Sequence, residues 1–211
     1  MLLKVQSRAD AHALVAALLP PKRLRHSECV AEAAEQLAQR NGVDSEKAWM
    51  AGMLHDCMKY AAPEAQQQLC VRYQKPLTAD DLCAPKIWHA FAAEAYLALE
   101  CGVTDPDVLA AVRWHTTGRA GMSKLEKVVF VADLISADRA YPDVERVRIL
   151  AAQSLEAAAK YILECVFAKL EREGARQVHP ASLAWYEELL NLEGESHDPR
   201  NTFADPRKNP G

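Results

Sequence analysis

Apolar residues recur three and four positions apart along most of this chain, and alternating segments are almost absent. This spacing places apolar side chains on one face of an α-helix, whereas a half-buried strand would require strict alternation. Alanine, leucine, glutamate and lysine, which all have good intrinsic helix propensity, dominate the same segments. The sequence therefore predicts an all-α fold.

Start and stop signals divide the chain into successive helices. Capping boxes at Ser7–Asp10 and Ser123–Glu126 predict two helix starts, and Asp44 can cap a third helix. The pairs Pro20–Pro21 and Asn41–Gly42 predict helix ends. We expect helices from the Ser7 box to Pro20, over 24–40 and 44–55, after Pro63, in the region opened by Thr78–Asp81, and over 85–102, 104–115, 123–136, 144–173 (with a break near Ser154) and 182–192.

The length and composition favour one domain followed by a tail. With 211 residues, of which 50% are hydrophobic, the chain can build one sizeable core. We expect that domain to cover residues 1–192. The segment 193–211 is polar and rich in Pro, Gly, Asp and Asn, so it cannot bury enough apolar area to offset the entropy of ordering. We therefore expect 193–211 to be a disordered tail.

The charge balance argues against nucleic acid as a partner. The 25 Lys and Arg residues face 29 Asp and Glu residues, so no global positive field attracts a phosphate backbone. No apolar run approaches the roughly 18 residues that a membrane-spanning helix requires, and from the N-terminal residues we expect no secretion signal. The six cysteines contain no C-x-x-C pair and are expected to be reduced thiols in a cytoplasmic protein.

Four polar residues stand out from the helical pattern: His26, His55, Asp56 and Asp133. Asp133 lies inside VVFVADLI, which is otherwise apolar on every face of its predicted helix. An ionised carboxylate in such surroundings needs a compensating partner. Two imidazoles and two carboxylates suit a divalent metal ion that keeps open positions for water and substrate.

Each of these residues also has a structural interpretation. His26 could be a solvated residue at the start of a helix, and His55–Asp56 could form a C-terminal cap. Asp133 could belong to a buried ion pair with Arg139 or Lys127. Periodicity alone does not place the four residues together in space.

A second set of residues has the chemistry to bind phosphate. Lys59 lies one helical turn beyond His55, and His89 follows a tryptophan on an amphipathic helix. The segment 115–119, His-Thr-Thr-Gly-Arg, ends another helix, and Arg139 follows the predicted helix of Asp133. Taken singly, these residues also fit roles as surface side chains or, for His89, as a hydrogen-bonded core histidine.

The order His26, His55-Asp56 and Asp133 resembles the HD superfamily of metal-dependent phosphohydrolases. More narrowly, the chain resembles the YqeK-type members, the symmetrical diadenosine tetraphosphate hydrolases. The matching stretches are LRHSECVAEAA, AGMLHDCMKY, IWHAFAAEAYLA and VRWHTTGRAGMSKLEKVVFVADLI, followed by RAYP. The resemblance spans roughly residues 20–150 and implies an HD-domain helical bundle.

The resemblance also implies a set of site residues. It assigns the metal to His26, His55, Asp56 and Asp133, and implies that the metal is iron, divalent or trivalent. Nitrogen and oxygen ligands alone also admit manganese, cobalt or zinc. We expect the catalytic groups to be Asp56, Lys59, His89 and His115. The expected substrate-binding residues are Arg23, His26, Lys59, His89, His115, Thr116, Asp133, Arg139 and a loop over the nucleotide formed by Arg176, Gln177, Val178, His179, Pro180 and Ala181.

The activity implied by the resemblance is cleavage of diadenosine tetraphosphate (Ap4A) into two ADP. Physically, this reaction is metal-assisted hydrolysis of a phosphoanhydride. A homodimer is compatible with the sequence. The alternatives are hydrolysis of another nucleotide, a nucleotide-binding sensor without turnover, or a helical scaffold or RNA-associated module, which the weak acidity and buried carboxylates disfavour.

The chain departs from the family pattern at two places. Ser136 and Ala137 stand where members often carry Glu-Pro, and Cys57 and Met58 replace a frequent Tyr-Ala. The first change alters the surroundings of Arg139 but leaves the predicted metal ligands intact. His89 and His115 could also be ligands of a second ion, since neutral imidazole serves either role.

Overall fold

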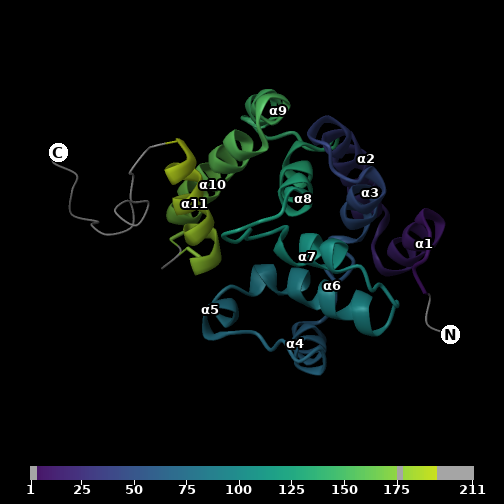
Figure 1. Ribbon diagram of the computed structural model, residues 1–211. Helices are drawn as coiled ribbons and strands as arrows, with labels where there is room; N and C mark the ends of the chain where they lie inside the picture. The colour runs from purple at the N-terminus through teal and green to yellow at the C-terminus, as the bar shows by residue number, and fades with distance from the viewer. Residues whose placement is uncertain (1–3, 175–177, 194–211) are drawn as a thin grey trace.

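The computed structural model describes residues 4–174 and 178–193. Within these ranges the chain folds into helices joined by turns and contains no strand, as Figure 1 shows, so the predicted all-α class is confirmed. Arg176, Gln177 and residues 194–211 lie outside the described ranges, so the expected nucleotide loop is described only from Val178 onward. The division of the chain at residue 192 stays a prediction. No helix in the described ranges is long and apolar enough to cross a bilayer.

The helices are, in chain order, α1 (Arg8–Leu18), α2 (Pro21–Asn41), α3 (Ser45–Leu54), α4 (Pro63–Arg72), α5 (Ala79–Leu82), the 3-10 turn η1 (Pro85–Ile87), α6 (Trp88–Leu99), α7 (Pro106–Trp114), α8 (Lys124–Ile135), α9 (Val144–Gln153), α10 (Leu155–Arg172) and α11 (Pro180–Glu193). The predicted starts at Ser7, Asp44 and Ser123 are confirmed, because each side chain accepts a hydrogen bond from a backbone N–H of the first turn. Ser154 both ends α9 and caps α10, at the place where a break was expected.

The structure corrects the boundaries of several predicted helices. The helix predicted over 24–40 begins at Pro21. Proline is favoured at the first helical position, because a backbone N–H there would have no partner within the helix. The helix predicted over 182–192 likewise begins with a proline, at Pro180. The helix predicted over 85–102 is divided into η1 and α6 and ends at Leu99.

Helix α8 lies at the centre of the molecule and organises the other helices. Helices α2 and α3 lie on one side of it, α10 and α11 on the other, and α7 below it in the view of Figure 1. It packs against α2, α3, α7, α9 and α10. A helix that is apolar all round must be buried, and Val128 to Ala132 are all buried in the structure. Apart from Asp133, the run VVFVADLI is apolar on every face, and this composition suits a helix that other helices surround.

Helix α11 closes the core on the side of α10. The indole of Trp185 is fully buried and packs edge-to-face against Phe130 of α8, with ring centroids 4.7 Å apart. It also lies directly on Gly118, where an added Cβ would come within 2.0 Å of the indole ring. Because Gly118 has a φ of +62°, this position requires glycine for both its backbone conformation and its lack of a side chain.

Helices α2 and α3 approach each other closely at Gly52. A Cβ at this position would lie 2.9 Å from the Cα of Ala31 and 3.1 Å from the carbonyl oxygen of Val30. Both neighbours are backbone atoms of α2, so they cannot move aside as a flexible side chain does. The absence of a side chain at Gly52 therefore sets the distance between the helices that carry His26 and His55.

We predict that Gly52→Ala destabilises the protein by about 1–2 kcal/mol. Alanine gains about 1 kcal/mol of helix propensity over glycine, but overpacking costs about 1–3 kcal/mol, and contact with backbone atoms favours the upper end. Urea denaturation followed by circular dichroism measures the free energy of unfolding. An equal or higher stability of the variant would contradict the close approach of α2 and α3.

Candidate functional site

Polar side chains from five helices meet beside α8. His26 lies in the second turn of α2, His89 in α6 and Asp133 near the end of α8, while His55 and His115 are the C-caps of α3 and α7. All four histidines are buried, with exposed fractions of 4% or less. Helix ends that point toward α8 thus bring together residues that are far apart in the sequence.

The four residues predicted as metal ligands converge in the structure. Nε2 of His26 lies 2.9 Å from Oδ1 of Asp133, and Nε2 of His55 lies 4.0 Å from the same oxygen. Asp56 adds its Oδ2 at 3.4 Å from Nε2 of His55. His26, His55 and Asp56 offer ligand atoms that all lie within 4.8 Å of one another, which makes them a group that could hold a metal ion.

Hydrogen bonds on the outer side of the imidazoles fix their orientation. Nδ1 of His55 donates to the carbonyl oxygen of Gly52 at 2.6 Å, and Nδ1 of His115 donates to that of Val112 at 2.7 Å. Since a carbonyl only accepts, the proton of each neutral ring lies on Nδ1 and the lone pair lies on Nε2. Both Nε2 lone pairs therefore point into the cluster, which is the arrangement of a metal-binding histidine.

Two buried atoms of the cluster have no hydrogen-bond partner among the described residues. They are Nε2 of His55 and Oδ1 of Asp56, although Asp56 and Lys59, respectively, bring charged groups close to them. Buried polar atoms are nearly always satisfied, because an unpaired one costs about 1–3 kcal/mol. In the neutral form of His55, the lone pair on its Nε2 and the carboxylate oxygen of Asp56 fit a metal ion as their missing partner.

Asp56 also belongs to a second group, with His89 and His115. Its Oδ1 lies 3.0 Å from Nε2 of His89 and 3.5 Å from Nε2 of His115. The two imidazole Nε2 atoms are 3.3 Å apart. The structure therefore places His89 and His115 beside the first group of ligands, with Asp56 shared between the two groups.

Three cations surround the carboxylates of the cluster. Arg23 donates to Oδ2 of Asp56 at 2.9 Å, and Nζ of Lys59 lies 3.5 Å from its Oδ1. Arg139 pairs with Oδ1 of Asp133 and also donates to the backbone oxygen of that residue at 2.7 Å. The ion pair between Asp133 and Arg139, which the sequence offered as an alternative to a metal site, is therefore present. Asp133 also contacts His26, so it remains part of the cluster.

The partners of the carboxylates outweigh the effect of burial on their ionisation. Burial raises the pKa of Asp56, but the imidazoles of His55, His115 and His89 hold it well below its ordinary value. Burial also opposes ionisation of Asp133, but contact with His26 and the charge of Arg139 lower its pKa. Both residues are therefore carboxylates near neutral pH and are available to bind a cation.

At two of the histidines, burial outweighs the effect of the neighbouring charges on the pKa. It lowers the pKa of His89 to about 4 and also lowers the pKa of His115. Both imidazoles are therefore neutral near pH 7 and have a lone pair to offer. At His55 burial is outweighed by the charge of Asp56, so the pKa is raised, and a metal ion would have to displace a proton there.

Asp138 is a residue of this cluster that sequence reasoning did not find. Its Oδ2 accepts a hydrogen bond from Nδ1 of His26 at 2.8 Å, and its Oδ1 accepts one from Oγ of Ser136 at 2.8 Å. Ser136 is one of the two departures from the family pattern, and here it fixes the carboxylate that orients His26. A carboxylate two residues after an unusual serine was the available signal.

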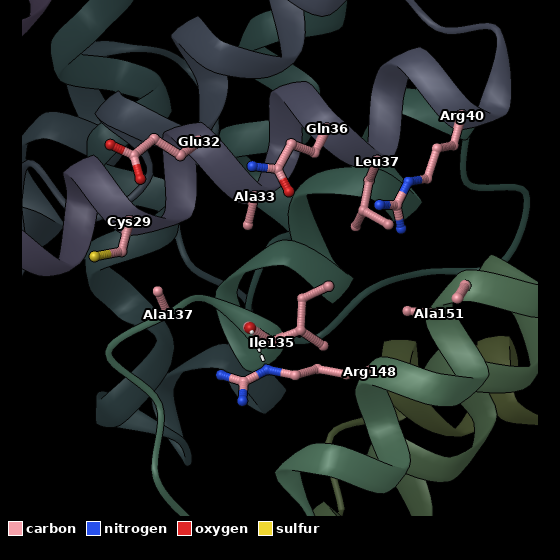
Figure 2. Close-up of a pocket in the computed structure, with 11 residues that line it drawn as sticks. Cys29, Glu32, Ala33, Gln36, Leu37, Arg40, Ile135, Ala137, Arg148 and Ala151 are labelled. Carbon is pink, nitrogen blue, oxygen red and sulfur yellow. Dashed lines mark hydrogen bonds between the residues drawn. The ribbon is translucent and has the colours of Figure 1, made fainter.

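Arg148 of α9 holds the loop that carries Asp138. Its guanidinium donates to the carbonyl oxygens of Ile135 at 3.0 Å, Ser136 at 2.9 Å and Arg139 at 3.3 Å. Figure 2 shows Arg148 reaching from α9 to Ile135 at one side of a pocket between α2 and α9. This pocket has a volume of about 440 Å³ and is lined by none of the four histidines, so it is separate from the cluster.

The remaining predicted residues lie around or outside the cluster. Thr116 follows His115, and its buried Oγ1 has no hydrogen-bond partner among the described residues. Val178 is buried in the core, and His179 contacts Oδ1 of Asp81 at 3.0 Å rather than the cluster. The last two predicted loop residues, Pro180 and Ala181, form the first turn of α11. Their role in binding stays a prediction.

Comparison with known proteins gives this geometry a family context. The model of the HD domain family matches residues 23–138. A symmetrical bis(5'-nucleosyl)-tetraphosphatase of Bacillus subtilis is 41% identical over 152 residues, which are 72% of this chain and 81% of the relative. A protein of the same name from Halalkalibacterium halodurans is 35% identical over 87% of this chain and 97% of its own length.

A solved structure supports the same placement. The crystal structure of an HD superfamily hydrolase from Clostridium acetobutylicum, described as involved in NAD metabolism, superposes with a TM-score of 0.85. It is 29% identical and covers 89% of this chain and 99% of its own. The resemblance inferred from the histidine and aspartate pattern is confirmed, and the chain belongs to the HD domain family.

Proposed function

We propose that this chain is a metal-dependent hydrolase that cleaves Ap4A symmetrically into two ADP. The reaction class follows from one observation: inward-facing imidazole lone pairs and ionised carboxylates lie together, with three cations around them. The substrate follows from the relatives named symmetrical bis(5'-nucleosyl)-tetraphosphatase, at 35% and 41% identity.

The metal ligands in this proposal are His26, His55, Asp56 and Asp133. The support is their convergence and the two unsatisfied atoms of His55 and Asp56. Iron is the proposed metal, while manganese, cobalt and zinc also accept such nitrogen and oxygen ligands. The group of Asp56, His89 and His115 would hold a second ion if one binds.

The charge of the cluster suits an anionic substrate. With neutral imidazoles, the carboxylates of Asp56, Asp133 and Asp138 balance the cations Arg23, Lys59 and Arg139. A bound divalent ion therefore leaves the cluster with two positive charges. With Asp56 and Asp133 holding such an ion, Arg23, Lys59 and Arg139 would be available to phosphate oxygens.

The bound ion would polarise a phosphoryl group and lower the pKa of a coordinated water. The side chains of the chain supply the remaining functions. Asp56 lies where it can orient the attacking water, and Lys59 and Arg139 neutralise charge on the phosphate chain. Nε2 of His89 accepts a hydrogen bond from Nζ of Lys59 at 3.0 Å and so holds that ammonium group in place.

In this proposal His89 and His115 act as neutral imidazoles rather than as acids. With pKa values lowered by burial, neither imidazole is protonated near pH 7. The departing ADP needs little help from an acid, because a terminal phosphate has its second pKa at about 6. Neutralisation of charge by Lys59 and Arg139 is therefore the more effective assistance to the leaving group.

The cellular setting is also part of the proposal. The six cysteines are free thiols, and four of them are buried, which supports a reducing compartment such as the cytoplasm. A homodimer stays a prediction.

We predict that protein supplied with iron, manganese or cobalt without oxygen converts Ap4A to ADP as the sole nucleotide product. Separation of the products by liquid chromatography distinguishes symmetrical from asymmetrical cleavage, because the latter gives ATP and AMP in equal amounts. ATP with AMP would contradict the proposed position of attack. Binding of Ap4A without turnover under all three metals would instead identify a sensor.

We predict that a divalent ion raises the thermal stability of the metal-free protein, and that Asp56→Asn abolishes this effect. An ion at 100 times its dissociation constant stabilises the folded state by about 2.7 kcal/mol. Differential scanning calorimetry with and without Mn²⁺ measures the shift. Asp81→Asn is the matched control, because Asp81 is a buried carboxylate outside the cluster. Equal Mn²⁺ shifts in both variants would exclude Asp56 as a ligand.

We predict that Asp138→Ala weakens metal binding by about 10- to 100-fold, because groups that orient a metal-binding histidine have effects of this size. Titration of the metal-free protein with Co²⁺, followed by absorbance, measures the affinity. Asp138→Asn should recover part of it, since an amide oxygen still accepts from Nδ1 of His26. Asp143→Ala is the control on the same loop, where the side chain makes no capping hydrogen bond. Unchanged affinity in Asp138→Ala would refute the orienting role.

A further inference from the structure

A pocket opens beside the cluster of histidines and carboxylates, between the start of α2 and the loop after α8. Its volume is about 450 Å³. It is lined by Lys22, Arg23, His26, Tyr60, Asp138, Arg139, Ala140 and Tyr141. His26 and Arg139 belong to the cluster described above, so this pocket is continuous with it, unlike the pocket in Figure 2.

The two tyrosines of this pocket differ in what their side chains contact. The hydroxyl of Tyr141 donates to the carbonyl oxygen of Leu134 at 2.9 Å, and burial raises its pKa to about 12. Tyr141 is thus a fixed part of the pocket wall. Tyr60 is 61% exposed and makes no hydrogen bond, ion pair or ring contact among the described residues. Its ring is therefore largely open to solvent.

The sequence position of Tyr60 places it just outside the phosphate-binding region. It directly follows Lys59, whose ammonium group lies 3.5 Å from Asp56. Lys22, Arg23 and Arg139 supply positive charge around the pocket, against the single carboxylate of Asp138. Because Tyr60 and Arg139 line the same pocket, a phosphate chain held by Arg139 would have room for its nucleoside beside the ring of Tyr60.

We propose that the ring of Tyr60 is the platform on which a nucleobase of the substrate stacks. This inference rests on the proposed function, and it names a residue that selects a nucleotide over a bare phosphate chain. An exposed aromatic ring beside a cationic pocket has the two features that bind a nucleotide: a flat apolar face for the base and positive charge for the phosphates. Stacking needs the ring and not the hydroxyl.

The test compares the binding of two ligands that differ by a nucleoside. ADP and inorganic pyrophosphate each carry two phosphates, and only ADP has a base. Isothermal titration calorimetry with Mn²⁺-loaded protein should show that Tyr60→Ala weakens ADP binding by about 10- to 100-fold, the range of a lost base stack. Pyrophosphate binding should change by less than about twofold, since stacking needs a base. Tyr60→Phe should keep ADP binding within about threefold because its ring is retained.

Three outcomes would refute the proposal that a nucleobase stacks on Tyr60. They are unchanged ADP affinity in Tyr60→Ala, an equal loss for ADP and pyrophosphate, and a loss in Tyr60→Phe as large as that in Tyr60→Ala. Tyr73→Ala is the control, because Tyr73 is a partly buried tyrosine at the end of α4 and does not line this pocket.

The binding test is independent of turnover. In one outcome, the wild-type protein fails to hydrolyse Ap4A while Tyr60→Ala still weakens the binding of ADP and not of pyrophosphate. That result would refute the proposed reaction and support base stacking on Tyr60. A protein that hydrolyses Ap4A to ADP with the same ADP affinity in wild type and Tyr60→Ala would support the reaction and refute the platform.

Discussion

The arrangement of the molecule depends on holding ionised carboxylates inside an apolar interior. Asp133 lies on a helix whose neighbouring residues Val128 to Ala132 are all buried, and Asp56 is itself 2% exposed. Removing such charges from water is costly unless partners and hydrogen bonds compensate. Here the compensation comes from imidazoles and cations on four other segments of the chain. The packing of α2, α3, α6 and α7 around α8 is therefore also the assembly of the site.

Helix termini do most of the positioning. His55 and His115 occupy equivalent places at the ends of α3 and α7, and each donates from Nδ1 to the carbonyl oxygen three residues earlier. A backbone carbonyl that would otherwise lack a helical partner thus fixes a side chain that has to present its other nitrogen. His26 obtains the same orientation from Asp138. The fold thus supplies a set of nitrogen and oxygen atoms that could hold a metal ion.

Much of this could be predicted from the sequence, for identifiable reasons. Capping residues such as Ser123 act within one turn, so the helices could be placed from local pattern alone. Asp133 stood out because a carboxylate contradicts its apolar surroundings. The convergence of His26 with Asp133 could not be predicted from pattern, because periodicity describes one helix at a time and says nothing about which helices are neighbours. The HD family resemblance supplied that information.

Other features had only a weak signal in the sequence. In the sequence, Asp138 resembles any other aspartate of a loop. Its contact with His26 follows from the loop conformation, which hydrogen bonds from Arg148 stabilise. The pairing of Arg23 with Asp56 required the start of α2 to be known, and the sequence placed that start three residues too late. Tyr60 reads as one more aromatic residue, and only its exposure beside a cationic pocket distinguishes it.

The most direct measurement is anomalous X-ray diffraction from crystals of the protein loaded with iron or manganese. The account predicts an anomalous peak between Nε2 of His26 and Nε2 of His55, with carboxylate oxygens of residues 56 and 133 completing the ligands. Those carboxylates would then have moved away from Arg23 and Arg139. A loaded crystal whose peak lies elsewhere, with both carboxylates still paired to the arginines, would contradict it.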